Sequence, residues 1–224
     1  MIVTILNHTP NPVETVAFAA KVCYSSMNIS DIKPQKHLVS KLIKSGHLSP
    51  LEHASFTFAV EGISRACSHQ LVRHRLASYS QQSQRYVGLY NFKYIIPPSI
   101  EKNEDLKNRY KQFMESTKDF YNEIAKTTSY EDARFILPNA TETKVIVTMN
   151  ARELLHFFSQ RCCNRAQWEI RFLANEMLRL VKEAAFEIFE NAGPPCIRGD
   201  CPEGEFSCKR RLDETYGKNS LPYS

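Results

Sequence analysis

The chain has 224 residues, of which 42% are hydrophobic, and a formal net charge of +5. This length and apolar content suffice for one well-filled core, so we expect a single domain over residues 1–224. No apolar run approaches membrane-spanning length and no secretory leader is recognisable, which favours the cytoplasm. Seven cysteines, an odd number, argue against a complete disulfide framework and favour reduced thiols.

Hydrophobic periodicity and turn residues predict helices and strands in irregular alternation. The first half is expected to contain a strand at 2–7, a helix from Pro12 to about Tyr24, a helix at 36–45 closed by Gly46, a strand at 55–60, a helix from its cap Ser64 to about Arg73, a loop rich in Ser and Gln, and a strand near 90–96. The second half is expected to contain a charged helix at 103–127, a short helix after Ser129, a strand at 144–149, a helix capped by Asn150, a long helix at 166–191, and an irregular tail at 194–224. The absence of a regular strand–helix repeat favours an α+β fold.

A stretch without acidic residues is the most unusual feature of the sequence. From Gly62 to Ile100 there is no Asp or Glu, whereas several cations occur there, namely Arg65, Arg73, Arg75, Arg85 and Lys93. Basic groups without local carboxylates need anions from elsewhere. Charge alone leaves two interpretations open: a site for an anionic ligand, and a solvated basic surface with distant partners.

Spacing within this stretch favours the anion site. On a helix Gln70, Arg73 and His74 would share one face, and Arg75 would point nearly the opposite way unless the helix ends between them. The next residues supply hydroxyls, amides and a guanidinium that suit a nucleotide or phosphate, namely Ser78, Ser80, Gln81, Gln82, Ser83 and Arg85. A polar surface turn is the alternative.

The helix after Asn150 carries the second unusual feature. Its apolar stripe continues into an arginine, in the order Leu154, Phe157, Phe158, Arg161. An arginine in register with a buried stripe must find an acceptor or reach water at the helix end. Three further polar candidates are Arg134, Arg152 and His156, although a lone histidine in such a place is more often structural.

Several motifs occur in the order found in flavin-dependent thymidylate synthases. Arg73-His74-Arg75, followed after seven residues by Ser83, resembles that family's RHR-x7-S motif, and residues 46–53 (GHLSPLEH) resemble its G-H-x-[ST]-P-x-E-H segment. Further matches are Gln70, Arg85-Tyr86, Asn150-Ala151-Arg152 with the later Arg161, and residues 166–170 (AQWEI). The resemblance covers roughly residues 1–190. Position 81, often glutamate in the family, is Gln81 here.

The resemblance implies an α+β fold with an antiparallel sheet and long helices. It implies a homotetramer with active sites between subunits. The implied reaction converts dUMP to dTMP, with methylenetetrahydrofolate as carbon donor, NADPH as reductant and bound FAD as the hydride source, and releases tetrahydrofolate. From the residues themselves we expect no metal ion, no nucleic acid polymer as partner and no membrane.

The same resemblance implies two sets of binding residues. The residues expected to contact FAD are Ser49, Arg73, His74, Arg75, Gln81, Asn150, Arg152 and His156. The residues expected to hold dUMP are Gln70, Arg73, Gln81, Gln82, Ser83, Gln84, Arg85, Arg134 and Arg161, some of them supplied by different subunits.

Among these side chains Arg161 is the candidate catalytic residue. C5 of uracil must become nucleophilic, and an arginine near N3 and O2 stabilises the negative charge that develops there. Arg85 and Arg134 would clamp the phosphate. Ser83 is expected to bind rather than to attack, because no carboxylate–His pair adjoins it in the sequence. For Cys162-Cys163 the expected role is that of small buried hydrophobes.

Three other functions stay open. A nucleic-acid-binding module would use the acid-free stretch, but the net charge is moderate and the basic loop is poor in aromatics. A metal site would use Cys196, Cys201 and Cys208, whose C-x4-C-x6-C spacing is not a standard zinc pattern and supplies three ligands locally. A flavoprotein oxidoreductase with another substrate is the nearest alternative enzyme.

Overall fold

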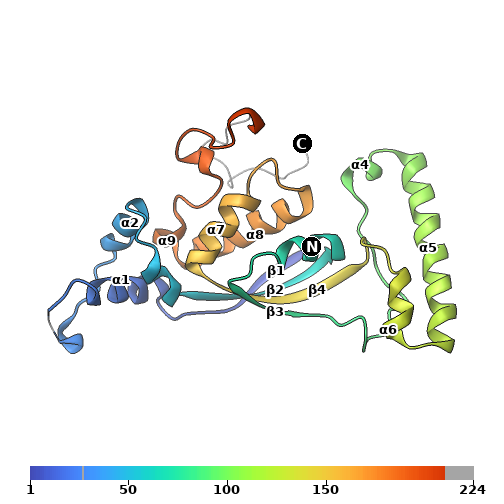
Figure 1. The fold of residues 1–224 in the computed structure, drawn as a ribbon, viewed down its shortest axis with the longest axis horizontal. Coiled ribbons are helices and arrows are strands. Elements are labelled where there is room, and N and C mark those ends of the chain that lie inside the picture. Colours follow the sequence, from blue (N-terminus) through green and yellow to red (C-terminus); the bar gives the residue numbers. More distant parts are fainter. Residues whose placement is uncertain (27, 210–224) are drawn as a thin grey trace. The chain divides into compact units, whose positions relative to one another are not determined.

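The computed structural model describes residues 1–26 and 28–209, which form an α+β structure with a four-stranded antiparallel sheet (Figure 1). The expected fold class is thereby confirmed. The sheet has the order β1-β2-β4-β3, with strands β1 Ile2–His8, β2 Ser55–Ser64, β3 Ala77–Gln81 and β4 Glu142–Asn150. No helix in the described ranges is long and apolar enough to cross a membrane.

The α-helices and the 3-10 turns between them account for most of the remaining described residues. The helices are α1 Pro12–Val22, α2 His37–Lys44, α3 Arg65–Leu71, α4 Pro98–Glu101, α5 Glu104–Thr127, α6 Tyr130–Ala133, α7 Ala151–Arg161, α8 Trp168–Ala184 and α9 Phe186–Phe189. The 3-10 turns are η1 Ile29–Asp31, η2 Ser49–His53, η3 Arg134–Ile136, η4 Pro195–Ile197 and η5 Gly204–Phe206.

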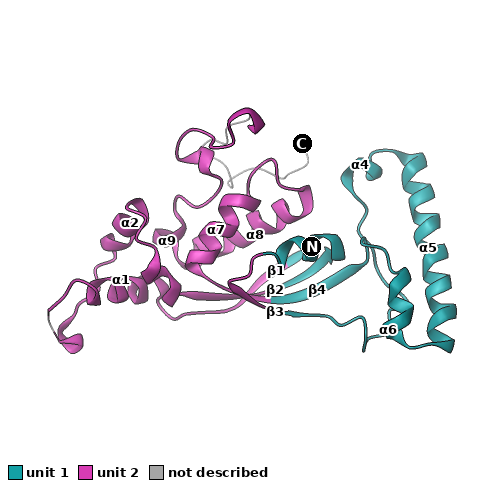
Figure 2. Ribbon diagram, in the orientation of Figure 1, with its two compact units in different colours: residues 1–2, 60–73, 80–146 teal, residues 3–59, 74–79, 147–224 magenta. Residues whose placement is uncertain are grey.

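The chain divides into two compact units, shown in Figure 2. Unit 1 comprises residues 1–2, 60–73 and 80–146, and unit 2 comprises residues 3–59, 74–79 and 147 onward. Each of the four strands contributes residues to both units.

The core of unit 2 forms on the inward positions of its strand segments. Phe56 and Phe58 of β2 are fully buried, as expected for an alternating strand with one covered face. Phe189 of α9 meets Phe56 edge-on, with ring centroids 5.5 Å apart, and lies 6.0 Å from the ring of Phe158 on α7. The predicted apolar stripe of α7 is therefore confirmed as core.

The long helix predicted at 166–191 is interrupted. Gln167 caps α8, which ends at Ala184, and Ala185 leaves the helical conformation with φ −154° before α9 begins. Because Ile188 continues the helical apolar period and is buried, periodicity alone could not reveal this break.

Unit 1 is organised around α5. Its two buried side chains are Met114 and Tyr121, and the Tyr121 hydroxyl accepts a hydrogen bond from the backbone N–H of Leu89 at 3.1 Å. The Tyr110 hydroxyl donates to the carbonyl of Ile95 at 3.0 Å. The strand expected near residues 90–96 is wrong, because α5 side chains hold this segment and its β-pairing is one isolated bridge, from Tyr94 to Thr141 just before β4.

The Ser/Gln-rich loop expected after α3 is also partly wrong. Its first residues form β3, the last strand in the sheet order, and the backbone N–H of Gln82 extends the pairing to the carbonyl of Lys144 at 3.0 Å. Every second residue of β3 is exposed, so the strand tolerates Ser and Gln, and its polar composition concealed it.

Candidate functional site

The Arg73-His74-Arg75 segment lies beyond the end of helix α3. That helix ends at Leu71, so the expectation of one helical face shared by Gln70, Arg73 and His74 is wrong. Arg73 and Arg75 are exposed, whereas His74 has 4% of its surface exposed. The chain thus turns the histidine inward and both arginines outward.

Within unit 2 the buried His74 joins a carboxylate to an arginine. Its Nδ1 lies 3.1 Å from Oε1 of Glu153, and Nε of Arg161 donates to its Nε2 at 3.1 Å. Arg161 is half-buried at the end of the α7 stripe. The sequence left open an internal acceptor or an escape to water, and the structure supplies the acceptor.

Electrostatics favour a neutral His74 in this cluster. Burial, the Arg161 charge and His156 together lower the pKa of His74 to about 4. Burial raises the pKa of Glu153, and His156 partly counteracts this shift. The ring of Phe157 meets the His74 ring edge-on, with centroids 4.8 Å apart, so an aromatic side chain packs against the imidazole.

The other expected FAD contacts of unit 2 are mostly exposed. Arg152 forms an ion pair with Glu52 in which both side chains are about half-exposed. His156 is exposed and its ring hydrogen-bonds the side-chain amide of Gln160 at 3.1 Å. Asn150 caps α7 through Oδ1, which accepts from the backbone N–H of Glu153 at 2.9 Å. Ser49 is exposed at the start of η2.

In unit 1 the side-chain amide of Gln81 donates to two hydroxyl groups. Ser68 Oγ donates to the carbonyl of Arg65 at 2.9 Å, so its oxygen accepts from Gln81 Nε2 at 2.9 Å. The same amide nitrogen lies 3.2 Å from the hydroxyl of Thr143. A glutamate could not donate to Ser68. The amide of Gln81 is therefore satisfied by these hydroxyls, whereas a glutamate at this position would have to accept hydrogen bonds from them.

The guanidinium of Arg85 finds a carboxylate elsewhere in unit 1. Its Nη2 lies 3.0 Å from Oε2 of Glu131 on α6, with the two side chains 47% and 48% exposed. The acid-free stretch therefore does not depend wholly on external anions, because its counter-charge comes from a segment distant in sequence. Ser83 Oγ accepts from the backbone N–H of Arg85 at 3.1 Å, which suits a turn-forming and binding role.

Two cations of unit 1, Arg65 and Arg134, interact with each other. Arg134 is half-buried at the start of η3, and burial together with the Arg134 charge lowers the pKa of Arg65. Two neighbouring guanidinium groups attract an anion. The remaining expected nucleotide contacts, Gln70, Gln82 and Gln84, are half-buried.

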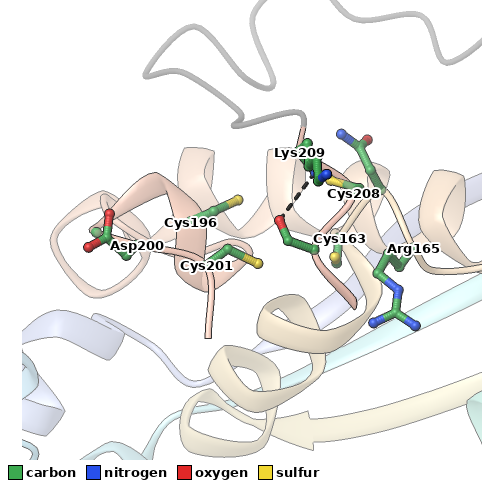
Figure 3. A pocket seen from close by; sticks show the side chains of 10 residues that line it. Cys163, Arg165, Cys196, Asp200, Cys201, Cys208 and Lys209 are labelled. Carbon is green, nitrogen blue, oxygen red and sulfur yellow. Dashed lines mark hydrogen bonds between the residues drawn. The ribbon is translucent and has the colours of Figure 1, made fainter. Parts of the chain in front are cut away.

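The cysteines near the tail gather around a hollow in unit 2. Cys162 is fully buried, which raises the pKa of its thiol and confirms its role as a small hydrophobe. Cys163 is instead half-buried and lines a hollow of about 220 Å³ with Cys196, Cys201 and Cys208 (Figure 3). Among residues 1–26 and 28–209, no three side chains of metal-ligating type are grouped so as to hold an ion. The tail expected to be irregular is so up to residue 209, apart from η4 and η5, and residues 210–224 lie outside the described part.

Sequence reasoning missed two residues of the His74 cluster. Glu153 is 5% exposed, and its place one turn before Phe157 could have revealed a carboxylate on the buried side of α7. The Tyr79 hydroxyl donates to the carbonyl of His74 at 2.8 Å and holds the turn. No local pattern signals this bond.

The chain matches known proteins over most of its length. A family model described as "Thymidylate synthase complementing protein" matches residues 4–185. A "Flavin-dependent thymidylate synthase" from Clostridium tetani is 50% identical, and the match covers 94% of each chain. Proteins of the same description from Geobacter sulfurreducens (52% identical, 95% of this chain and 96% of that protein covered) and Pyrococcus furiosus (48% identical, 96% and 95% covered) are similarly close. The chain therefore belongs to the flavin-dependent thymidylate synthase family.

Proposed function

We propose that this chain converts dUMP to dTMP, taking the carbon from methylenetetrahydrofolate and releasing tetrahydrofolate, with NADPH as the reductant. The chain is an FAD-dependent enzyme of the thymidylate synthase type. The observation that carries the assignment is the Arg161 guanidinium, held by a buried histidine inside the family's motifs. Bound FAD supplies the hydride in this reaction.

The exposed donors of unit 2 suit the anionic FAD. Arg75 presents an exposed guanidinium, and Ser49 and His156 present exposed polar groups. Arg152 is paired with Glu52, but exposed pairs contribute little, so a ligand phosphate can take the carboxylate's place. The chemistry of this donor set therefore fits the cofactor, and we assign these residues to FAD together with Arg73, His74, Gln81 and Asn150.

The residues of unit 1 suit the nucleotide. A phosphate dianion can displace Glu131 from Arg85, because that ion pair is half-exposed and weak. Arg134 adds a half-buried cation, and Ser83 adds a hydroxyl. We assign the dUMP contacts to these three and to Gln70, Arg73, Gln81, Gln82, Gln84 and Arg161.

In the reaction Arg161 stabilises the negative charge that develops on the pyrimidine. A planar guanidinium can meet N3 and O2 together, whereas an ammonium cannot. The half-buried position strengthens this interaction, because water screens it less. Arg161 is accordingly the proposed catalytic residue.

The proposal includes a homotetramer in the cytoplasm, with the whole chain acting as one domain. An exposed apolar row on α5 supports assembly, since Leu106, Phe113 and Phe120 repeat every seven residues. Such a repeat forms the seam of paired helices.

The test is product analysis with purified protein, dUMP, methylenetetrahydrofolate and NADPH. We expect dTMP and tetrahydrofolate in equal amounts, with FAD released on denaturation. Formation of dihydrofolate instead, or flavin-loaded protein that makes no dTMP, would defeat the proposal.

A further inference from the structure

We propose that Glu153 and His74 are positioning residues that aim Arg161 through a buried chain of hydrogen bonds. This inference rests on the proposed function of Arg161 and assigns a role to Glu153, which none of the family motifs discussed above includes. His74 then acts through Arg161 in addition to its proposed contact with FAD.

The hydrogen bonds of the relay can run in one direction only. Arginine is always a donor, so the Nε–H of Arg161 requires a lone pair on Nε2 of His74. The proton of the neutral imidazole must then lie on Nδ1, where the carboxylate of Glu153 accepts it at 3.1 Å. A doubly protonated His74 would place two donors against each other. Glu153 therefore selects the tautomer that can hold Arg161.

The geometry of α7 builds this relay into unit 2. Glu153 and Arg161 stand two turns apart with Phe157 between them, and His74 bridges the two ends. Side chains of Glu153 and His74 are only 6% and 3% exposed, so water does not compete for these bonds. The Tyr79 hydroxyl fixes the His74 backbone. Each member of the relay thus has a defined hydrogen-bond partner within unit 2.

The bond to His74 uses the inner nitrogen of Arg161. The two terminal amino groups, the end that can meet a pyrimidine, lie outside this bond. Fixing Nε therefore sets the plane and direction of the guanidinium without occupying its recognition edge. Preorganised donors of this kind need no reorientation as charge develops.

The experiment compares Glu153→Gln, His74→Phe and His74→Gln in single-turnover oxidation of reduced flavin with saturating dUMP and methylenetetrahydrofolate. Glu153→Gln keeps the shape of the glutamate side chain, but its amide can donate to Nδ1 of His74 and thereby place the imidazole proton on Nε2. His74→Phe removes the nitrogen that accepts from Arg161. We expect both to slow the chemical step about 100-fold, the scale of a 1 Å misplacement, while dUMP affinity changes less than about fivefold. His74→Gln can still accept from Arg161 and should restore part of the rate.

Glu169→Gln is the matched control, because Glu169 is a second buried glutamate, 2% exposed, on α8. We expect its chemical step to stay within about twofold of wild type. Equal slowing of Glu153→Gln and this control would mean a general loss of buried charge, and would overturn the relay.

A double-mutant cycle identifies Arg161 as the point of action. In an Arg161→Lys background, which lacks the Nε–H, Glu153→Gln should slow the chemical step by no more than about twofold further. A full additive loss would show that Glu153 acts by another route.

Crystal structures of the wild type and of Glu153→Gln test the relay without any activity measurement, because they show the position of the Arg161 side chain in each protein. We expect Arg161 to be ordered against His74 in the wild type and displaced in the variant. An Arg161 that keeps its place in Glu153→Gln would refute the inference, even if the protein makes dTMP. Failure to make dTMP would refute the proposed function and leave this structural comparison decisive for the relay.

Discussion

The buried neutral His74 should make the folded chain sensitive to acid. Folding lowers the pKa of His74 from 6.5 to about 4, chiefly through burial and then through the Arg161 charge. Between these values the unfolded chain binds a proton that the folded chain rejects, so stability is lost as the pH falls from about 6.5 toward 4. Above about pH 6.5 the contribution of His74 to stability is constant.

The expected size follows from linkage. At pH 5 the solution is about 1.5 units below the unfolded pKa and still above the folded one, and each unit is worth about 1.4 kcal/mol. His74 should therefore cost about 2 kcal/mol of folding free energy between pH 7.5 and pH 5. The raised pKa of Glu153 works in the opposite direction, because the folded carboxyl retains its proton to higher pH.

The assay is urea unfolding of the flavin-free protein at pH 7.5 and pH 5, at one fixed protein concentration. His74→Gln cannot titrate, so its loss of stability on acidification should be smaller than that of the wild type by about 2 kcal/mol. His37→Gln, which changes an exposed histidine on α2, should follow the wild type. If His74→Gln loses as much stability as the wild type, His74 is not held neutral by the fold.

Two further predictions concern ligand binding and assembly. Arg75→Ala should weaken FAD retention more than Arg85→Ala does, whereas Arg85→Ala should raise the dUMP dissociation constant about tenfold, because the exposed pair with Glu131 limits the gain; equal effects on both ligands by equilibrium titration would contradict this division. Phe113→Glu should reduce the assembly size measured by light scattering, because it places charge in the exposed apolar row of α5, while Ile29→Glu should not; an unchanged mass for Phe113→Glu would refute the assigned interface.

Local signals in the sequence predicted the helix starts correctly. Ser64, Ser129 and Asn150 each cap a helix, with their side-chain oxygens accepting backbone N–H groups three residues later. Such caps need only the residues beside them, so no distant contact can override the signal. The apolar stripe of α7 was readable for the same reason, since its period lies within one element.

Pairing across long stretches of chain decided what the sequence could not. The residues of β3 are polar, so their composition did not predict a strand. The segment at 90–96 has the composition of a strand but packs on α5. In both cases the secondary structure depends on which other segment of the chain lies alongside. The charge pattern likewise identified Arg85 as a cation without a local carboxylate. It could not predict the ion pair of Arg85 with Glu131, which is 46 positions away.

The candidate site divides along the same line. The sequence determined the family motifs and placed Arg161 at the end of a buried stripe, because helical register is a local property. The acceptor of its hydrogen bond, His74, lies 87 positions earlier in the sequence, and the carboxylate that orients His74 belongs to Glu153 on α7. Only the tertiary structure could bring these three together, since a buried donor is satisfied by whichever acceptor the packed core places within reach.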